Sequence, residues 1–258
     1  MEIEGLVVVV TGASSGLGRR FAVDLAQAGA VVIGVARRRQ LLESLAAELK
    51  ARSPRSDTRA CDVTDTDSFV ALLHAVEKDW GRIDVLVNDA GVGENRGEQS
   101  LEAARAVMET NFFAAVAGTL AVLPGMVRRG SGVVVNVSSD SGRAPGPGEP
   151  AYGASKAALS AFSEAMSMRL DGTGARVQVL YPGWVPTAMG SGAVDEGMPM
   201  PPRSVRRTEE QVSAALRRHL GGRRDDIDAA ALARLAPVAR ALAPRLYRRG
   251  VIKASGGS

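Results

Sequence analysis

The sequence predicts one α/β domain, built on a doubly wound parallel sheet with helices on both faces and followed by a helical C-terminal extension. Five short runs rich in β-branched residues are continuously apolar rather than alternating, as expected of strands that are covered on both faces. Helical stretches separate these runs along the chain. Strands that alternate with helices need crossover connections, which place helices on both sides of a parallel sheet.

The expected strands are 6–10, 31–35, 85–87, 133–137 and 177–180, and the expected helices are 18–28, 40–50, 68–79, 101–129 and 151–170. Two Gly/Pro-rich stretches, 141–150 and 182–202, are predicted loops. Ligands of open α/β sheets bind beyond the carboxyl ends of the strands, so both loops should border a substrate. We divide the chain into a dinucleotide-binding and catalytic core (1–190), a substrate lid region with a following helix (191–222) and a basic helical extension of the same domain (223–258).

Composition excludes several classes of protein. Cys61 is the only cysteine, and the two histidines, His74 and His219, lie far apart, so we expect neither a disulfide, nor a metal site, nor a histidine-based catalytic triad. The longest uncharged apolar stretches fall short of the ~20 residues that span a bilayer, and the first residues show no basic region followed by an apolar segment, so we expect no signal peptide. We expect a soluble, cytoplasmic protein.

The formal net charge of +4 conceals an asymmetry. Residues 200–258 carry 13 Lys/Arg against 5 Asp/Glu, a net charge of +8, whereas the remainder carries 19 against 23, a net charge of −4. Aromatic residues make up only 4% of the chain and are not interleaved with the arginines, so no nucleic-acid partner is expected.

The first predicted strand runs into Thr11-Gly12-Ala13-Ser14-Ser15-Gly16-Leu17-Gly18, and a helix follows. The glycines allow a tight turn that leaves backbone amides at a helix N-terminus, an arrangement that binds pyrophosphate. The turn lacks the Gly-Lys-Ser/Thr ending of a P-loop, which disfavours kinases and NTPases.

The second predicted strand ends at Ala36 and continues into three arginines, 37–39, with no acidic residue to bind a ribose 2′-hydroxyl. Arg37, together with hydroxyl groups of Ser14 and Ser15, could instead bind a 2′-phosphate. We therefore predict NADP(H) in preference to NAD(H).

Tyr152 and Lys156 are four residues apart in a predicted helix, so they lie on one face. An isolated pair of this kind is usually a solvated helix face, but this helix begins after Pro150, beside the predicted cofactor site. A free phenol has a pKa near 10, so a tyrosine base needs its pKa lowered by roughly 2 to 3 units. We expect the Lys156 ammonium and an oxidised nicotinamide to supply that field.

Several motifs occur in order and together resemble the short-chain dehydrogenase/reductase family over most of residues 5–190. They are the glycine turn, Asp62-Val63, Asn88-Asp89-Ala90-Gly91, Asn111, Ser138-Ser139, Tyr152-Gly153-Ala154-Ser155-Lys156 and Pro182-Gly183. The resemblance implies a Rossmann-type sheet and hydride transfer between a nicotinamide and a carbonyl/alcohol pair. It implies that Tyr152 is the general acid/base and Ser139 the hydrogen-bond partner of the substrate oxygen, and that Asn111 supports a water-mediated proton relay with Lys156.

The resemblance also implies the cofactor contacts. Asp62 and Val63 would hold the adenine; Asn88, Ala90 and Gly91 would line the ribose and fix the central sheet; Val185 and Thr187, after Pro182 and Gly183, would contact the nicotinamide amide and the phosphates. With the glycine turn, the expected cofactor-binding set is Gly12, Ser14, Ser15, Gly16, Leu17, Gly18, Arg37, Asp62, Val63, Asn88, Ala90, Gly91, Tyr152, Lys156, Pro182, Gly183, Val185 and Thr187. Asp89 departs from the family, which often has a second asparagine there.

On the substrate side we expect contacts from Ser139, Tyr152, Trp184 and Met189. Methionines 189, 198 and 200 and prolines 186, 199, 201 and 202 suit an apolar lid, which favours a hydrophobic ketone or secondary alcohol.

Residues 228–249 suggest an Ala/Leu/Arg helix broken at Pro237 and Pro244, with apolar positions at Leu232, Leu235, Leu242 and Leu246. We expect this helix to fold back over the substrate pocket, in preference to contacting a membrane surface or a partner.

The sequence thus predicts an NADP-dependent oxidoreductase acting on a small carbonyl or alcohol substrate. The alternatives are a 3-oxoacyl thioester reductase, which the altered C-terminus disfavours, and a non-catalytic regulator that senses NADPH. The two long predicted helices, 101–129 and 151–170, resemble those that pair between subunits in relatives, so a homodimer or homotetramer is expected.

Overall fold

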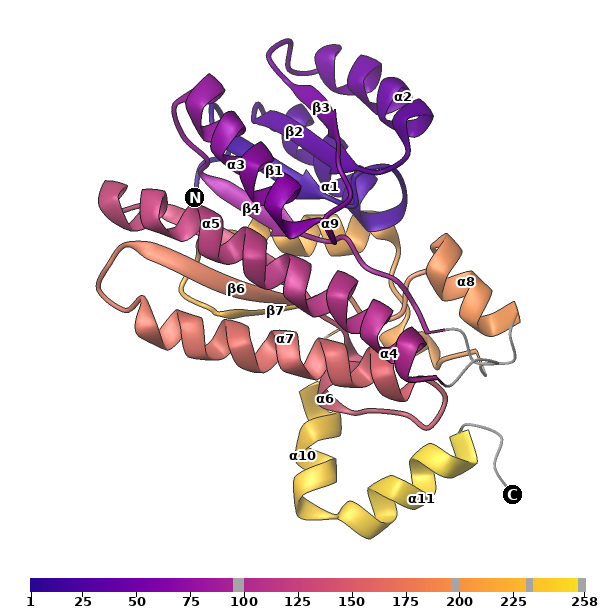
Figure 1. Ribbon diagram of the computed structural model, residues 1–258. Helices are drawn as coiled ribbons and strands as arrows, with labels where there is room; N and C mark the ends of the chain where they lie inside the picture. Colours follow the sequence, from indigo (N-terminus) through magenta and orange to yellow (C-terminus); the bar gives the residue numbers. More distant parts are fainter. Residues whose placement is uncertain (95–99, 196–199, 231–233, 255–258) are drawn as a thin grey trace.

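The computed structural model describes residues 1–94, 100–195, 200–230 and 234–254. Its centre is a seven-stranded sheet, parallel throughout, in the order β3-β2-β1-β4-β5-β6-β7 (Figure 1). The strands are β1 (Val7–Thr11), β2 (Val31–Ala36), β3 (Asp57–Ala60), β4 (Val85–Asn88), β5 (Gly132–Val137), β6 (Ala175–Tyr181) and β7 (Asp226–Asp228). The strand order reverses between β1 and β4, and such switch points are where open α/β sheets bind ligands.

Helices cover both faces of the sheet. Side chains of α1 (Gly16–Gln27), α2 (Arg39–Lys50) and α9 (Glu209–His219) pack against one face. Those of α3 (Thr66–Trp80) and α5 (Ala114–Arg129) pack against the other, which α7 (Pro150–Arg169) also covers. Alternate residues of β1 face opposite layers: Val8 and Val10 join the first cluster, and Val7 and Val9 the second. The predicted doubly wound fold is therefore confirmed.

Helix α4 (Leu101–Met108), a π-helical segment (Glu109–Phe113) and α5 form one continuous helix, Leu101–Arg129. By length and composition this helix could cross a membrane. However, Val122, Leu123 and Met126 are buried in the core cluster that also contains residues of α3, β4 and β5. We therefore interpret it as a core helix of the domain.

Two strands were not expected from the sequence. β3 is an edge strand of sequence Asp-Thr-Arg-Ala, half exposed, and it lacks the apolar run that marks the inner strands. The sequence of β7 is Asp-Ile-Asp, and Ile227 is its one buried apolar residue. Both strands were missed because they contain charged residues and no apolar run: β3 has no fully buried residue and β7 has one.

Both predicted loops contain short helices. α6 (Asp140–Arg143) lies at the start of the stretch 141–150, and α8 (Ala188–Asp195) lies within 182–202, followed by a 3₁₀ turn, Arg203–Val205. The prediction of an uninterrupted loop was wrong in both places. Met198 and Pro199 of the expected lid lie outside the described residues.

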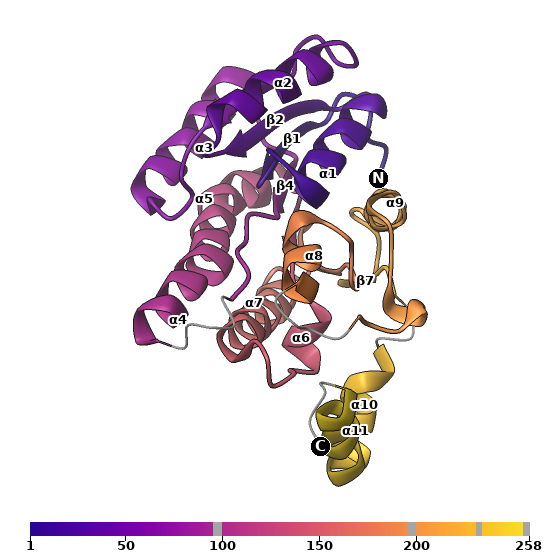
Figure 2. The ribbon, with the colours of Figure 1, turned by 90° about the vertical axis from the view of Figure 1, so that its right-hand side faces the viewer.

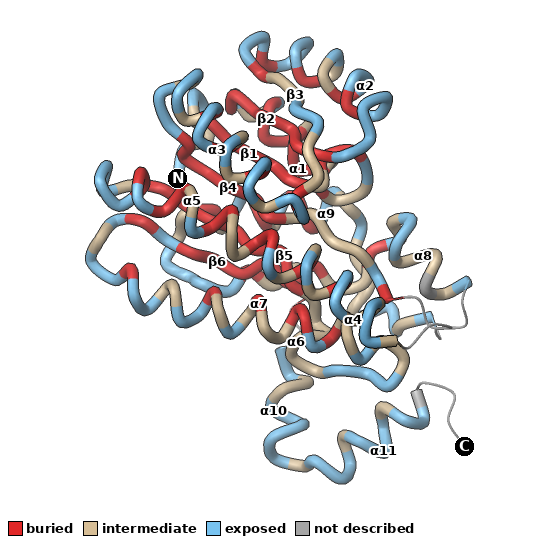
Figure 3. The backbone as a smooth tube through the Cα atoms, in the orientation of Figure 1, coloured by how far each residue is buried: buried red, intermediate tan, exposed pale blue. Residues whose placement is uncertain are grey.

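The C-terminal helix begins later than predicted. β7 occupies the residues up to 228, and the extension then forms α10 (Leu235–Leu242) and α11 (Pro244–Ala254). The break at Pro244 is confirmed, whereas Pro237 lies in the first turn of α10, where a missing amide breaks no helical hydrogen bond. Leu232 lies outside the described residues. The pair of helices projects from the body beyond α6 and is largely exposed (Figures 2 and 3).

The turn between α7 and β6 offers a test of backbone packing. Gly172 and Gly174 both have positive φ, +76° and +83°, but a Cβ at Gly172 would meet open space, whereas a Cβ at Gly174 would overlap the Gly130 carbonyl oxygen. We expect Gly172→Ala to lower the free energy of unfolding by about 1 to 2 kcal/mol, the cost of left-handed backbone. Gly174→Ala should cost about 1 to 3 kcal/mol more, through the added overlap. Urea unfolding measures both, and equal losses would contradict the packing described.

Candidate active site

A cavity of about 540 Å³ lies at the carboxyl edge of the sheet, where residues that follow β1, β2, β4, β5 and β6 converge. Most of the residues expected from the sequence line this cavity. They are Gly12, Ser14, Ser15, Gly16, Leu17, Arg37, Asp62, Val63, Ala90, Gly91, Ser139, Tyr152, Lys156, Pro182, Gly183, Trp184, Val185, Thr187 and Met189. Residues from distant parts of the chain thus meet around one space large enough for a small organic ligand.

Two expected cofactor contacts are not among the residues that line the cavity. A Cβ at Gly18 would lie 2.6 Å from the Gly12 carbonyl oxygen, so this glycine permits close packing of helix α1 against the turn. The Asn88 amide is buried and donates to Asn136 Oδ1 at 2.8 Å and to the Ala115 carbonyl at 3.2 Å. Asn88 therefore ties β4 to β5 and α5, which is the sheet-fixing part of its expected role, and its ribose contact stays a prediction.

The glycine turn has the geometry of a phosphate cradle. Gly12 and Gly16 have φ angles of +69° and +54°, and a Cβ at Gly12 would lie 3.0 Å from the backbone of Ala90. Ser15 precedes α1 but makes no side-chain capping bond, so its hydroxyl does not occupy the first amides of the helix. Of these amides, that of Gly18 bonds the Asp89 carboxylate. Free amides at a helix N-terminus, beside a glycine turn that lets a ligand approach, fit the pyrophosphate of a dinucleotide.

Two arginines lie beside this cradle, and sequence reasoning named only the first. Arg37 Nη1 lies 3.6 Å from Asp62 Oδ2, and its side chain is mostly exposed. Arg38 instead donates to Ser14 Oγ at 2.8 Å and to Ser15 Oγ at 2.6 Å, and it also lines the cavity. Arg38 is therefore the arginine held against the glycine turn. The sequence indicated it only through its position in the same run of arginines.

The catalytic residues expected from the sequence come together. Helix α7 brings Lys156 Nζ to 5.8 Å from the centre of the Tyr152 ring. Ser139, which follows β5, is hydrogen-bonded to the Tyr152 side chain, and its Oγ also accepts from the Ser141 amide at 3.1 Å. Ser139 thus caps α6 and orients the phenol as well. Ser138 Oγ turns away and donates to the Lys156 carbonyl at 3.0 Å.

Burial determines how the two side chains of α7 ionise. It raises the pKa of Tyr152 to about 12, although the hydrogen bond with Ser139 opposes the rise. Without a nicotinamide in the site the phenol therefore holds its proton at neutral pH, and the lowering expected from Lys156 together with an oxidised nicotinamide stays a prediction. Burial also lowers the pKa of Lys156 to about 8, against the attraction of Asp89, which leaves the ammonium as the larger population at pH 7.

Asn111 lies in the π-helical segment and is 1% exposed. It does not line the cavity but joins two walls of it. Its Oδ1 accepts from the Val92 amide at 2.8 Å, and its Nδ2 donates to the Val92 carbonyl at 3.0 Å and to Ser155 Oγ at 3.1 Å. The buried amide is thus satisfied, and it positions the segment after β4 against α7; π-bulges of this kind are frequent at functional sites.

Two acidic residues of the site were not expected to have a role. Burial raises the pKa of Asp89 to about 8, against the attraction of Lys156. Burial likewise raises the pKa of Asp140 to about 6, against the attraction of Arg143. Asp140 lines the cavity directly after Ser139. The signal for Asp89 was present, since it stands where relatives often have a neutral asparagine.

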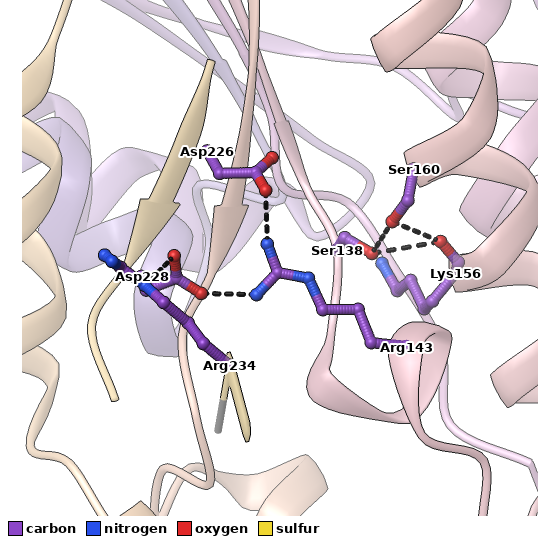
Figure 4. A network of polar contacts seen from close by, with 7 residues as sticks. All are labelled: Ser138, Arg143, Lys156, Ser160, Asp226, Asp228 and Arg234. Carbon is purple, nitrogen blue, oxygen red and sulfur yellow. Dashed lines mark hydrogen bonds and ion pairs between the residues drawn. The ribbon is translucent and has the colours of Figure 1, made fainter. Parts of the chain in front are cut away.

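Arg143 of α6 anchors the segment after Ser139 to the far edge of the sheet (Figure 4). Its guanidinium pairs with Asp226 at 2.5 Å and with Asp228, and it stacks on the Tyr181 ring at 3.2 Å from the centroid. Arg234 adds a second ion pair to Asp228 at 2.6 Å. The far edge strand is thereby fastened to the substrate side of the cavity.

Within the described residues, no group of three or more His, Cys, Asp or Glu side chains could hold a metal ion.

Known proteins with a similar sequence or fold identify the family to which this chain belongs. Residues 6–196 match the family model for short chain dehydrogenases. A short chain dehydrogenase of Pseudocercospora fijiensis is 38% identical over 194 residues, which are 74% of this chain and 63% of that protein. The chain thus spans less than two thirds of the length of this relative.

Solved structures agree. A short-chain dehydrogenase from Streptomyces avermitilis superposes with a TM-score of 0.80 at 30% identity and full coverage of both chains. An actinorhodin polyketide ketoreductase with NADPH superposes with a TM-score of 0.78 at 30% identity, over 87% of this chain and 95% of the other. The chain belongs to the short-chain dehydrogenase family, a family of NAD(P)-dependent oxidoreductases.

The raised pKa of Asp89 makes a prediction about pH. The folded state retains a proton that the unfolded chain, with an ordinary carboxyl pKa of 3.8, releases, so ionisation of Asp89 makes stability fall as pH rises from about 4 to about 8. Asp89→Asn removes this loss. We expect the variant to gain at least about 1.4 kcal/mol over the original chain between pH 4 and pH 8, the equivalent of one pKa unit.

Urea unfolding at a series of pH values measures this gain. Asp62→Asn is the matched control, because hydrogen bonds from Thr64 and the charge of Arg37 outweigh burial and lower the pKa of Asp62, so its contribution is lost only as pH falls below about 4. Parallel pH profiles for the original chain and Asp89→Asn would contradict the description of Asp89.

Proposed function

We propose that this chain is an NADP(H)-dependent oxidoreductase that interconverts a hydrophobic ketone and its secondary alcohol, with Tyr152 as the general acid/base. The observation that carries the proposal is that the Tyr152 phenol, hydrogen-bonded to Ser139, faces the same cavity as the phosphate cradle. A substrate carbonyl and a nicotinamide can therefore occupy one space.

The nicotinamide, when bound, supplies the hydride to the substrate carbon or accepts it. Every other part of the reaction falls to side chains of this chain. In reduction, the Tyr152 hydroxyl donates its proton to the developing alkoxide, a role that suits a phenol with a raised pKa. The Ser139 hydroxyl donates a hydrogen bond to the same oxygen and stabilises the charge that develops there.

In the oxidising direction, Tyr152 must first lose its proton. The Lys156 ammonium is the cation of the site that can stabilise the resulting phenolate, and its field is strong because both groups are buried. Asn111 remains the predicted support of the proton relay, through its hold on Val92 and Ser155.

The substrate side of the cavity supports the proposed substrate class. Trp184, Val185, Met189, Pro201 and Val205 give it an apolar wall. The name of the polyketide ketoreductase neighbour keeps the thioester alternative open, and comparing turnover of a 3-oxoacyl thioester with that of a free ketone separates the two. A regulator that only senses NADPH is the other alternative, which the retained set of Ser139, Tyr152 and Lys156 disfavours.

A cytoplasmic location and a homodimer or homotetramer stay predictions. For the oligomer, the exposed side chains of Phe113, Leu120 and Val127, along the outer side of the long helix, and of Met168 in α7 offer an apolar surface of the kind that subunits bury.

The catalytic assignment makes a direct prediction. Tyr152→Phe removes the transferable proton and leaves the ring, so turnover of ketones with NADPH should fall about 100-fold to 10,000-fold. NADPH affinity, followed by fluorescence, should change little. Tyr247→Phe, in α11 and away from the cavity lining, is the matched control and should retain turnover. Unchanged turnover in Tyr152→Phe would refute the catalytic role, and NADPH binding without turnover of any ketone or alcohol by the original chain would favour the regulator.

The cofactor preference can be tested with variants of the three consecutive arginines, because the third of them serves as a control for the first two. Arg37→Asp and Arg38→Gln should each weaken NADPH binding by at least about tenfold, the loss expected for a charge-assisted hydrogen bond, with little effect on NADH. Arg39→Gln, at the exposed start of α2 and outside the cavity lining, should leave both affinities unchanged. Equal losses for NADPH and NADH would show that neither arginine recognises the 2′-phosphate.

A further inference from the structure

The C-terminal helices α10 and α11 form a hairpin that is attached to the body at one end. Arg234, just before α10, pairs with Asp228, and Arg240 Nη1 donates to the Arg143 carbonyl at 3.2 Å. Ala236 is the residue of α10 that lines the cavity, and α10 contains no buried residue. The predicted folding back over the substrate pocket is therefore limited to this first turn, and the remainder of the hairpin points away from the sheet (Figures 1 and 2).

The hairpin exposes large apolar side chains that its own packing does not cover. Leu235, Val238 and Leu242 are 59%, 51% and 82% exposed, and their spacing of three and seven residues places them on one face of α10. Leu246, at the start of α11, is 70% exposed. Four exposed apolar side chains within twelve residues form a patch, whereas single exposed leucines scattered over a surface need no explanation.

The same hairpin is exclusively basic. From Ala229 to the C-terminus the sequence contains six Lys/Arg and no Asp/Glu, although the rest of the chain up to residue 199 is net acidic. Arg245, Arg248, Arg249 and Lys253 surround Leu246 on α11, and no ion pair involving them occurs within the described residues. The apolar patch is thus bordered by a dense positive charge that the body of the protein does not neutralise.

We propose that this hairpin docks the protein on a lipid bilayer that carries anionic headgroups. Leucines beside arginines and lysines match such an interface, where apolar side chains enter the acyl boundary and cations meet the headgroups. A second hairpin is a poor occupant, because two copies would bring the four cations of α11 on one hairpin, which have no ion pair within the described residues, against the same four on the other. The bilayer provides both the apolar layer and the opposite charge that the patch lacks.

Vesicle sedimentation with the full chain tests this proposal. The vesicles are pure phosphatidylcholine and an equimolar mixture of phosphatidylcholine and phosphatidylglycerol. We expect binding to the mixture, weakened by added salt, and little binding to phosphatidylcholine alone. The two hairpin variants, Leu242→Ser/Leu246→Ser and Arg245→Glu/Arg249→Glu, should each lower the partition coefficient by at least about tenfold.

Two matched controls lie outside the hairpin. Leu101→Ser, at the exposed start of α4, tests an exposed leucine, and Arg128→Glu, in the last turn of α5, tests an exposed arginine; both should bind like the original chain. The urea midpoints of all four variants show that the core is intact, which is expected because the changed residues lie outside it.

Several results would overturn the proposal: no binding of the original chain to mixed vesicles, equal binding to both vesicle types, or hairpin variants that bind as well as the controls. A molar mass that falls in the hairpin variants, measured by light scattering, without vesicle binding by the original chain would assign the patch to contacts between copies. None of these results depends on turnover, so the proposed oxidoreductase function stands or falls separately.

Discussion

The structure of the site depends on the burial of one ammonium group, that of Lys156. Lys156 is 5% exposed, and its Nζ donates to the carbonyl of Val137, the last residue of β5, at 2.9 Å. An ion without such partners would be too costly to bury. A Cβ at Gly91 would lie 3.5 Å from Nζ, so the segment after β4 leaves room for the ammonium. The end of a strand and the loop beside it are both arranged around this charge.

The same constraint extends along α7. The Lys156 carbonyl accepts hydrogen bonds from Ser138 at 3.0 Å and from Ser160 at 2.9 Å (Figure 4). The Ser138 hydroxyl thereby fixes the helix turn that carries the ammonium to the end of β5, which also leads into Ser139. Ser160, one turn further along α7, bonds the same carbonyl and lies 2.8 Å from Ser138 Oγ. The position of Tyr152 relative to Ser139 thus follows from how the lysine is held, because one helix carries both Tyr152 and Lys156.

Much of this arrangement could be predicted from the sequence, because the inner strands are continuous apolar runs and the motifs fall at strand ends. Sequence patterns could not predict the role of a residue where the same residue type occurs both at the cavity and in the surrounding packing. The sequence cannot distinguish three consecutive arginines, and only the fold shows that Arg38 contacts Ser14 and Ser15. Asn88 and Gly18 belong to the same motifs as the cavity residues, yet they serve packing, which no spacing can reveal. Ile227 is the one buried apolar residue of β7, which is too little for a periodic signal in the sequence.

Arg143 and Arg234 both pair with Asp228, whose side chain is 2% exposed. The boundary that the sequence suggested at residue 223 therefore marks a change of composition, because ion pairs link the residues on its two sides. A chain shortened before Arg234 would leave an almost completely buried carboxylate with one guanidinium where it now has two. Both β7, which carries Asp228, and α6, which carries Arg143, would lose stability together. The C-terminal extension is therefore part of the structure that stabilises the substrate side of the domain.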